Sequence, residues 1–296
     1  MKRITPVWNG LKFYEFALSF YEALTSKISS AALKKNTILR IFNSVEEQNE
    51  WFVACDQKEL GALLSEEMVP NTIESLRAPL GFGRVLGSFQ LNTHVLLDDY
   101  QQFLSEENVL MEEEFHYHLL QVRPEGLQYK DFIASKIVFA EGTAAIQNPF
   151  FPQEGLIPKK GEYITIKAPQ LHLEDIVKGS YFIIPLGNDC YKVGATFAHQ
   201  DTSFKTTEAG KETLIMGLKK AISVPFEVVN QEFGFRPTVS DRKPMIGNLP
   251  SAENIYFLNG LGTRGFLMAP LLSSHLFYFM EGLSEIPSEM DIRRFS

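Results

Sequence analysis

Residues 255–270, with the sequence IYFLNGLGTRGFLMAP, decide the fold of this 296-residue chain. A short apolar run at 255–258 leads into a GxGxxG pattern at 260–265, and an apolar segment follows. This order predicts a strand, a tight turn and a helix, which is also how a dinucleotide-binding βαβ unit opens. Such a unit must end in a second parallel strand. No second apolar strand follows the predicted helix, so the turn is expected to close a domain.

A turn of this kind has chemical value as well as a structural role. Its glycines let backbone N–H groups approach a ligand closely. The helix that follows has partial positive charge at its N-terminus, which suits an electron-rich or anionic group. Considered alone, such a turn is more often a plain connection than a binding site. The candidate ligand-binding residues are Gly260, Gly262, Thr263, Arg264, Gly265 and Phe266.

Other short motifs precede the turn in a fixed order. GFRP lies at 234–237 and DRKPMIG at 241–247, and weaker motifs are KGE at 160–162, Ile184-Pro185 and GAT at 194–196. The ordered set resembles the FAD-dependent amino-acid and amine oxidoreductases, the family of D-amino-acid oxidase, glycine oxidase and sarcosine oxidase. The turn itself, with Arg264-Gly265 before Phe266, is most similar to the oxidase half of the bifunctional tRNA wobble-uridine modification enzymes.

The resemblance implies FAD as the cofactor, with the N–H groups of 260–266 facing the pyrimidine edge of the flavin. It also implies that Arg236, in GFRP, is the catalytic-site residue that holds a substrate carboxylate. A guanidinium can bind a carboxylate through two parallel hydrogen bonds. Without the motif, an ion pair between domains would be the better explanation of Arg236.

The front of the chain departs from the family pattern. Members open with a strand, a GxGxxG turn and a helix that bind the adenosine diphosphate of FAD. Here MKRITPVW at 1–8 corresponds to a point past that unit, and GFGR at 81–84 lacks the third glycine. The expected fold is therefore mixed α/β. It combines an FAD/NAD(P)-binding-type domain that lacks its first βαβ unit with a D-amino-acid-oxidase-like substrate domain built on an antiparallel sheet.

The resemblance implies two discontinuous domains. Residues 1–30, 91–152 and 237–296 are assigned to a partial FAD-binding domain, and residues 31–90 and 153–236 to the substrate domain. Hydrophobic periodicity predicts helices over 10–26 and from Thr207, and a capping box in which Glu47 bonds the Ser44 N–H. Thr93 is expected to cap another helix. The expected strands are 37–42, 115–122, 127–132, 137–140, 162–167, 180–185, 190–196 and 228–235, of which 137–140 is expected to be buried on both faces.

Composition excludes several classes of function. The net charge of −8 and isoelectric point near 5.4 disfavour a nucleic-acid partner, because phosphate binding needs clustered Lys and Arg. Two cysteines cannot form a disulfide framework, and no apolar run is long enough to span a bilayer, so a cytoplasmic protein is expected. No metal site is predicted, since His116 and His118 have no third ligand nearby. An unpaired sheet edge is expected to favour homo-oligomers.

These inferences predict an FAD-dependent oxidoreductase that oxidises a C–N bond of a small amino acid or secondary amine. One alternative is an oxidase of the tRNA wobble-uridine modification type. Another is a non-catalytic remnant, or a protein that binds its ligand without flavin.

Overall fold

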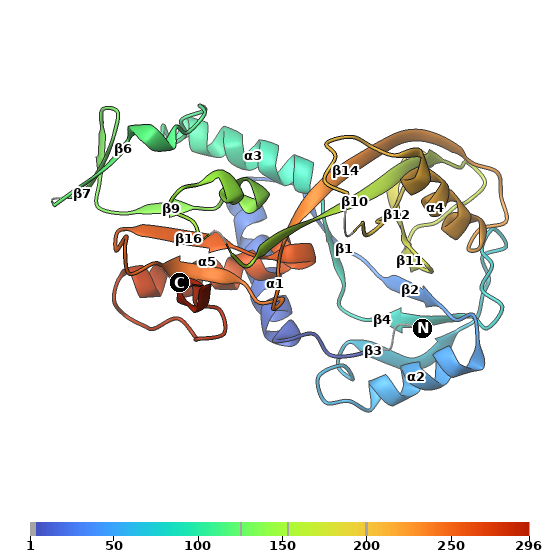
Figure 1. Ribbon diagram of the computed structural model, residues 1–296. Coiled ribbons are helices and arrows are strands. Elements are labelled where there is room, and N and C mark those ends of the chain that lie inside the picture. Colours follow the sequence, from blue (N-terminus) through green and yellow to red (C-terminus); the bar gives the residue numbers. More distant parts are fainter. Residues whose placement is uncertain (1–3, 125, 153, 199–200, 296) are drawn as a thin grey trace. The chain divides into compact units, whose positions relative to one another are not determined.

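The computed structural model describes residues 4–124, 126–152, 154–198 and 201–295 (Figure 1). The helices in these residues are α1 (Gly10–Lys27), α2 (Val45–Cys55), α3 (Thr93–Glu106), α4 (Glu208–Lys219) and α5 (Gly265–Met280), with short 3-10 turns η1 (Tyr117–Leu119), η2 (Gly142–Gln147), η3 (Gly262–Arg264) and η4 (Ile292–Phe295). The strands are β1 (Leu33–Lys35), β2 (Ile38–Ile41), β3 (Leu64–Val69), β4 (Phe82–Val85), β5 (Phe89–Leu91), β6 (Leu120–Arg123), β7 (Gly126–Tyr129), β8 (Phe132–Ala134), β9 (Ile137–Phe139), β10 (Leu156–Lys167), β11 (Ile176–Lys178), β12 (Phe182–Gly187), β13 (Cys190–Gly194), β14 (Glu227–Val239), β15 (Met245–Asn248) and β16 (Ile255–Asn259).

The chain divides into two compact units. Unit 1 contains residues 1–11, 25–97 and 160–234, and unit 2 contains residues 12–24, 98–159 and 235–296. Each unit has its own apolar core. Among the described residues, no helix combines the length and the apolar character that a membrane crossing requires.

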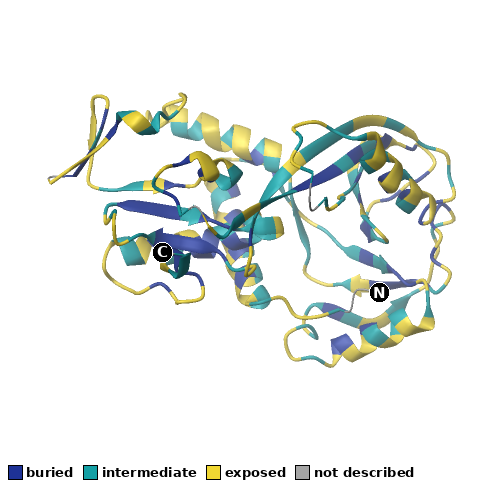
Figure 2. Cartoon of the chain, in the orientation of Figure 1, coloured by how far each residue is buried: buried dark blue, intermediate teal, exposed yellow. Residues whose placement is uncertain are grey.

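Unit 1 is built mainly on an eight-stranded sheet in the order β14-β10-β13-β12-β11-β2-β4-β3. The antiparallel pairing of β10, β13 and β12 confirms the sheet expected from the middle of the sequence. β2 joins this sheet through a parallel pairing with β11, so the sheet is mixed. Along β10, Ile164 and Ile166 are buried while Lys167 is exposed, and Figure 2 shows the central strands alternating between buried and less buried positions.

Two helix starts differ from their expected capping. The Ser44 hydroxyl accepts a hydrogen bond from the Glu47 N–H, as predicted. The Glu47 carboxylate, however, accepts from the Asn43 N–H at 2.8 Å, one residue before the donor that the capping box uses. At α3, the side chain of Asn92 accepts from the Val95 N–H, so Thr93 is the first helical residue rather than the cap.

The core of unit 2 surrounds a three-stranded sheet in the order β15-β16-β9. β16 pairs antiparallel with β15 and parallel with β9, and Phe139 and Phe257 are both buried at partner positions. The expectation that 137–140 is buried on both faces is wrong, because Val138 is 41% exposed. Among the described strands β9 lies at the edge of this sheet, where no further strand covers it.

The predicted hairpin before β9 is confirmed in outline. β6 and β7 pair antiparallel with Arg123 opposite Gly126, and β8 adds a third strand. The first expected strand is shorter than predicted, because Tyr117–Leu119 form a 3-10 turn. The second is divided, since Lys130 has a left-handed backbone (φ 51°) that turns the chain between β7 and β8.

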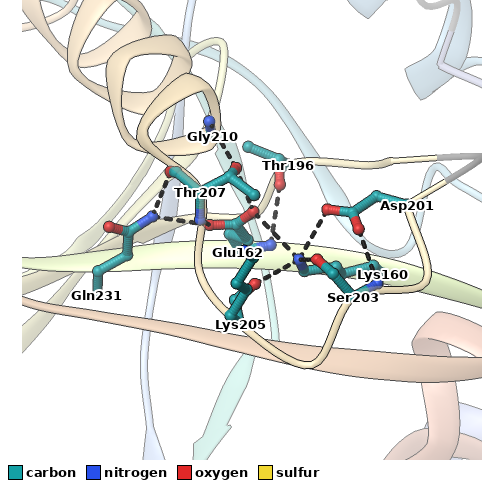
Figure 3. Close-up of polar contacts among 9 residues, drawn as sticks. All are labelled: Lys160, Glu162, Thr196, Asp201, Ser203, Lys205, Thr207, Gly210 and Gln231. Atoms are coloured by element: carbon teal, nitrogen blue, oxygen red, sulfur yellow. Dashed lines mark hydrogen bonds and ion pairs between the residues drawn. The ribbon is translucent and has the colours of Figure 1, made fainter.

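The KGE motif lies inside β10, not before a strand, and carries a fully buried lysine (Figure 3). Lys160 is 0% exposed. Its ammonium donates to the Asp201 carboxylate at 2.7 Å, to the Ser203 hydroxyl at 3.0 Å and to the Lys205 carbonyl. The hydrogen bond from Lys160 is the main cause that holds the pKa of Asp201 well below its usual range.

Glu162 is the buried anionic partner on the same strand. Its carboxylate lies 3.8 Å from the Lys160 ammonium and accepts from the Thr207 N–H, the Thr207 hydroxyl and the Gln231 side-chain amide. Thr207, where the helix was expected to begin, is the N-cap of α4, and the helix itself starts at Glu208. The two charges therefore fasten residues 201–207 and the start of α4 to the sheet, which makes the KGE motif a structural feature of unit 1.

Removing the buried ammonium tests this conclusion. Lys160→Met should lower the free energy of unfolding by about 3–5 kcal/mol, because the buried Glu162 carboxylate is left without its cation. The measurement is urea unfolding followed by circular dichroism. Lys211→Met is the matched control, since the Lys211–Glu208 pair is exposed and should contribute less than about 1 kcal/mol. Equal losses in the two variants would contradict the structural role.

Candidate functional site

The carboxyl ends of β9 and β16 form one edge of the unit 2 sheet. The strands are parallel neighbours, with Ile137 opposite Ile255 and Phe139 opposite Phe257. β9 leads into Glu141-Gly142, and β16 leads into Gly260. Ligands of open α/β sheets bind outside the carboxyl ends of their strands. This edge is therefore the candidate site, and it contains the predicted turn.

Asn259, the last residue of β16, joins the two strand ends. Its side chain is 2% exposed. The amide nitrogen donates to the Gly142 carbonyl at 2.7 Å, and the amide oxygen accepts from the Gly260 N–H at 2.7 Å. Sequence reasoning missed Asn259, because an Asn before a Gly is an ordinary turn signal and its partner is far away in the sequence.

The glycines of the turn are required for different reasons. Gly260 has φ 74°, and a Cβ there would lie 2.5 Å from the Val239 side chain and 3.1 Å from the Met245 nitrogen. Gly262 has φ 58°, and a Cβ there would lie 3.5 Å from the Thr238 methyl group. The protein's own backbone and packing therefore require Gly260, and its backbone conformation favours Gly262.

Gly265 has no such internal reason. It has φ −51° as the first residue of α5, and a Cβ there would meet only the Leu261 Cβ, at an ordinary 3.9 Å. The first N–H groups of α5 have no partners within the helix. The Phe266 carbonyl accepts a hydrogen bond from the Tyr21 hydroxyl at 2.7 Å, which anchors the helix start. Space and donors are thus available to a ligand at Gly265, while the Thr263 side chain beside it is exposed.

Arg264 precedes α5 and is half-buried. Loss of solvent is the cause that lowers the pKa of its guanidinium, and no carboxylate among the described residues opposes this effect. A desolvated cation that has no anionic partner in the described part of the chain, next to a helix N-terminus, suits an electron-rich ligand.

Arg236 lies within β14 and not at its end, since the strand continues through Val239. It is half-buried, and desolvation lowers the pKa of its guanidinium. Thr238 is two residues further along the strand, and successive alternate residues share one face. Because Thr238 borders Gly262 and Val239 borders Gly260, the end of β14 lies against the predicted turn. Arg236 and the turn both belong to unit 2.

Glu141, after β9, is held by two side chains that sequence reasoning missed. The Tyr117 hydroxyl donates to one carboxylate oxygen at 2.7 Å, and the Asn148 amide donates to the other at 2.8 Å. Asn148 is fully buried. Desolvation, followed by the hydrogen bond and the charge of Glu141, raises the pKa of Tyr117 to about 12. The chain order gives no hint of this cluster, because its members lie in three different segments.

The structure describes no group of three or more His, Cys, Asp or Glu residues that could hold a metal ion. The rings of His116 and His118 lie 5.7 Å apart.

The close packing around Gly260 leads to a prediction about stability. Gly260→Ala should lower the free energy of unfolding by about 1–2 kcal/mol through the left-handed backbone alone, and the contact with Val239 adds to this. Gly234→Ala is the control, since its Cβ would meet nothing within 4 Å. It should stay within about 1 kcal/mol of the wild type. Urea unfolding measures the free energy of unfolding of both variants. Equal losses in the two variants would contradict the packing role of Gly260.

The Tyr117–Glu141 contact leads to a pH prediction. A phenol whose pKa is about 12 when folded and roughly 10 when unfolded stabilises the fold fully below pH 10. This contribution is lost as the pH rises through about 12. The stability gap between the wild type and Tyr117→Phe should therefore narrow between roughly pH 10 and 12. Unfolding at several pH values measures it, with Tyr278→Phe as an exposed control. A gap that does not change with pH would refute the prediction.

Comparison with known proteins assigns the chain to a family. A model described as DAO, FAD dependent oxidoreductase, matches residues 5–278. The tRNA 5-methylaminomethyl-2-thiouridine biosynthesis bifunctional protein MnmC of Marinobacter nauticus is 27% identical over 134 residues, which are 41% of this chain and 21% of that protein. The uncharacterized oxidoreductase YurR of Bacillus subtilis is 27% identical over 128 residues, which are 37% of this chain and 34% of that protein. The matched segments thus span about a fifth and a third of these curated relatives.

Solved structures show the same fold. Glycine oxidase from Geobacillus kaustophilus superposes with a TM-score of 0.80 at 18% identity, covering 99% of this chain and 85% of that one. Iminodiacetate oxidase from Chelativorans sp. BNC1 superposes with a TM-score of 0.74 at 16% identity, covering 99% and 86%. The expected mixed α/β fold of the D-amino-acid-oxidase type is confirmed, and FAD is the cofactor of the family. The chain belongs to the DAO family of FAD-dependent oxidoreductases.

Proposed function

We propose that this protein uses FAD to oxidise a C–N bond of a small amino acid or secondary amine. The observation that carries the proposal is that Thr238 borders Gly262, since a Cβ on Gly262 would lie 3.5 Å from the Thr238 methyl group. The strand that contains Arg236, the candidate carboxylate-binding residue, therefore lies against the turn that would hold the flavin.

The residues of the turn fit the electron-rich edge of a flavin. Gly265 leaves room for close approach, the first N–H groups of α5 have no partners within that helix, and Arg264 adds a desolvated positive charge. When bound, FAD supplies an isoalloxazine ring that accepts a hydride. The residues from Gly260 to Phe266 would hold the edge of the ring on which negative charge develops, and donors fixed in advance there stabilise that charge.

Arg236 would orient the substrate. A half-buried guanidinium binds a carboxylate more strongly than one in bulk water, because the local dielectric constant is lower. A bidentate pair also fixes the direction of the α-carbon.

In this assignment unit 2 corresponds to the partial FAD-binding domain and most of unit 1 to the substrate domain. The two free cysteines, Cys55 and Cys190, support a reducing, cytoplasmic compartment.

The second candidate is an oxidase that removes a carboxymethyl group from modified tRNA. The 27% sequence identity over 134 residues to the MnmC protein of Marinobacter nauticus favours this candidate. The net charge of −8 opposes it, since a tRNA surface requires clustered Lys and Arg. The third candidate, a protein that binds a ligand without flavin, shares the site but carries out no oxidation.

Anaerobic flavin reduction distinguishes the three candidates. The full chain is mixed with FAD, and glycine, an N-methyl amino acid, a simple secondary amine or a tRNA bearing carboxymethylaminomethyluridine is added. Loss of the oxidised flavin spectrum with the amino acids is the expected result. Reduction by the tRNA alone would support the second candidate. A chain that binds no flavin, or whose flavin none of these compounds reduces, would overturn the proposal.

Arg236→Leu tests the role of the guanidinium. Loss of a charge-assisted pair in a closed site costs on the order of 2–5 kcal/mol, so the reduction rate with amino acids should fall by roughly 30- to several-thousand-fold. Amines without a carboxylate should be hardly affected, and so should the amount of bound FAD. Arg123→Leu, at an exposed arginine of β6, is the control. Equal losses with both substrate types would make Arg236 a structural residue.

A further inference from the structure

We propose that Asn259 is a positioning residue for the flavin-binding turn, and that it acts by locking the end of β9 to the end of β16. This inference rests on the proposed function, because the turn that Asn259 positions is the one assigned to the flavin.

The first step is the position of Asn259 in the sheet. The parallel register of β9 and β16 brings the chain after Phe139 alongside the chain after Phe257. The backbone turns at Gly142 (φ 58°) and at Gly260 (φ 74°), in the left-handed region at both places. The register of β9 with β16 ends at Phe139 and Phe257, before either turn is reached, so the strand pairing alone does not fix the distance between the two turns.

The second step is the chemistry of the lock. The Asn259 side chain donates to the Gly142 carbonyl and accepts from the Gly260 N–H, each at 2.7 Å, while 2% exposed. A primary amide supplies one donor group and one acceptor group side by side. Aspartate keeps the acceptor but replaces the donor with a second anionic oxygen, which would face the Gly142 carbonyl. Leucine removes both hydrogen bonds.

The third step links the lock to the ligand. Gly260 begins the turn whose later residues, from Gly262 to Phe266, offer N–H groups to the flavin edge. Those donors are effective only if they keep a fixed position while charge develops. Gly142 borders open space, since a Cβ there would meet nothing within 4 Å. A shift at Gly142 would therefore change the outline of the site without meeting packed side chains, whereas the turn at Gly260 is held against Val239 and Met245.

The test uses Asn259→Asp in the full chain, with FAD as the probe. Near pH 8 the variant should bind FAD about tenfold or more weakly than the wild type, because one buried hydrogen bond is lost and a repulsive contact replaces it. Amide hydrogen exchange should be faster at residues 140–144 and 258–266. Burial should raise the pKa of the new aspartate, because Asn259 is 2% exposed.

Acid rescue provides the decisive measurement. A protonated aspartic acid again has a donor beside an acceptor, so FAD affinity and slow exchange should return toward wild-type values near pH 5. If the variant is unfolded at pH 8, it should refold near pH 5 and regain its FAD affinity there. Asn248→Asp is the matched control. It makes the same substitution at the end of β15, opposite Tyr256, where the side-chain amide donates to the Glu253 carbonyl.

The outcomes separate the two proposals. Unchanged FAD affinity and unchanged exchange in Asn259→Asp would overturn the positioning role. Equal weakening in both variants, or no recovery in acid, would also overturn it. If the wild type binds no FAD, the proposed function fails, and the exchange at residues 140–144 alone decides whether Asn259 locks the two strand ends.

Discussion

The parallel pairing of β9 with β16 sets Ile137 opposite Ile255, and just beyond it the hydrogen bond from Asn259 to Gly142 joins residues that are 117 positions apart in the sequence. Parallel neighbours cannot be linked by a tight turn, so everything between them must leave the sheet and return. Because both strands run in one direction, their carboxyl ends meet at one edge. The glycine turn and the Glu141 cluster gain a common location from this single constraint.

At this edge the same residue type serves different purposes. Gly260 is needed because Val239 and Met245 leave no room for a Cβ, and Gly262 because its backbone is left-handed. Gly265 has neither reason, and its open surroundings are what a closely approaching ligand needs. Three glycines that look equivalent in the sequence therefore differ in the structure: Gly260 is required by packing, Gly262 is favoured by its backbone conformation, and Gly265 has room beside it.

Unit 1 shows how buried charge can serve structure rather than chemistry. Lys160 and Glu162 are removed from water, yet each has hydrogen-bonding partners, which come from residues 201–207 and, for Glu162, also from Gln231 of β14 (Figure 3). Every buried polar side-chain atom among the described residues has such a partner. The desolvation of the pair is thereby compensated, and residues 201–207 are held against the sheet.

The sequence by itself determined the elements whose signals are local. The apolar periodicity over 10–26 predicted α1, the helix expected from Thr207 is α4, and the glycine pattern predicted the change from β16 to α5. The ordered motifs predicted the family. Only the tertiary structure decided which side chains meet. Asn259 bonds a carbonyl from another strand, Tyr117 and Asn148 converge on Glu141, and Thr238 reaches Gly262. Periodicity and turn chemistry act over a few residues, whereas these contacts depend on strand order and register, which arise only when distant segments bury their apolar faces together.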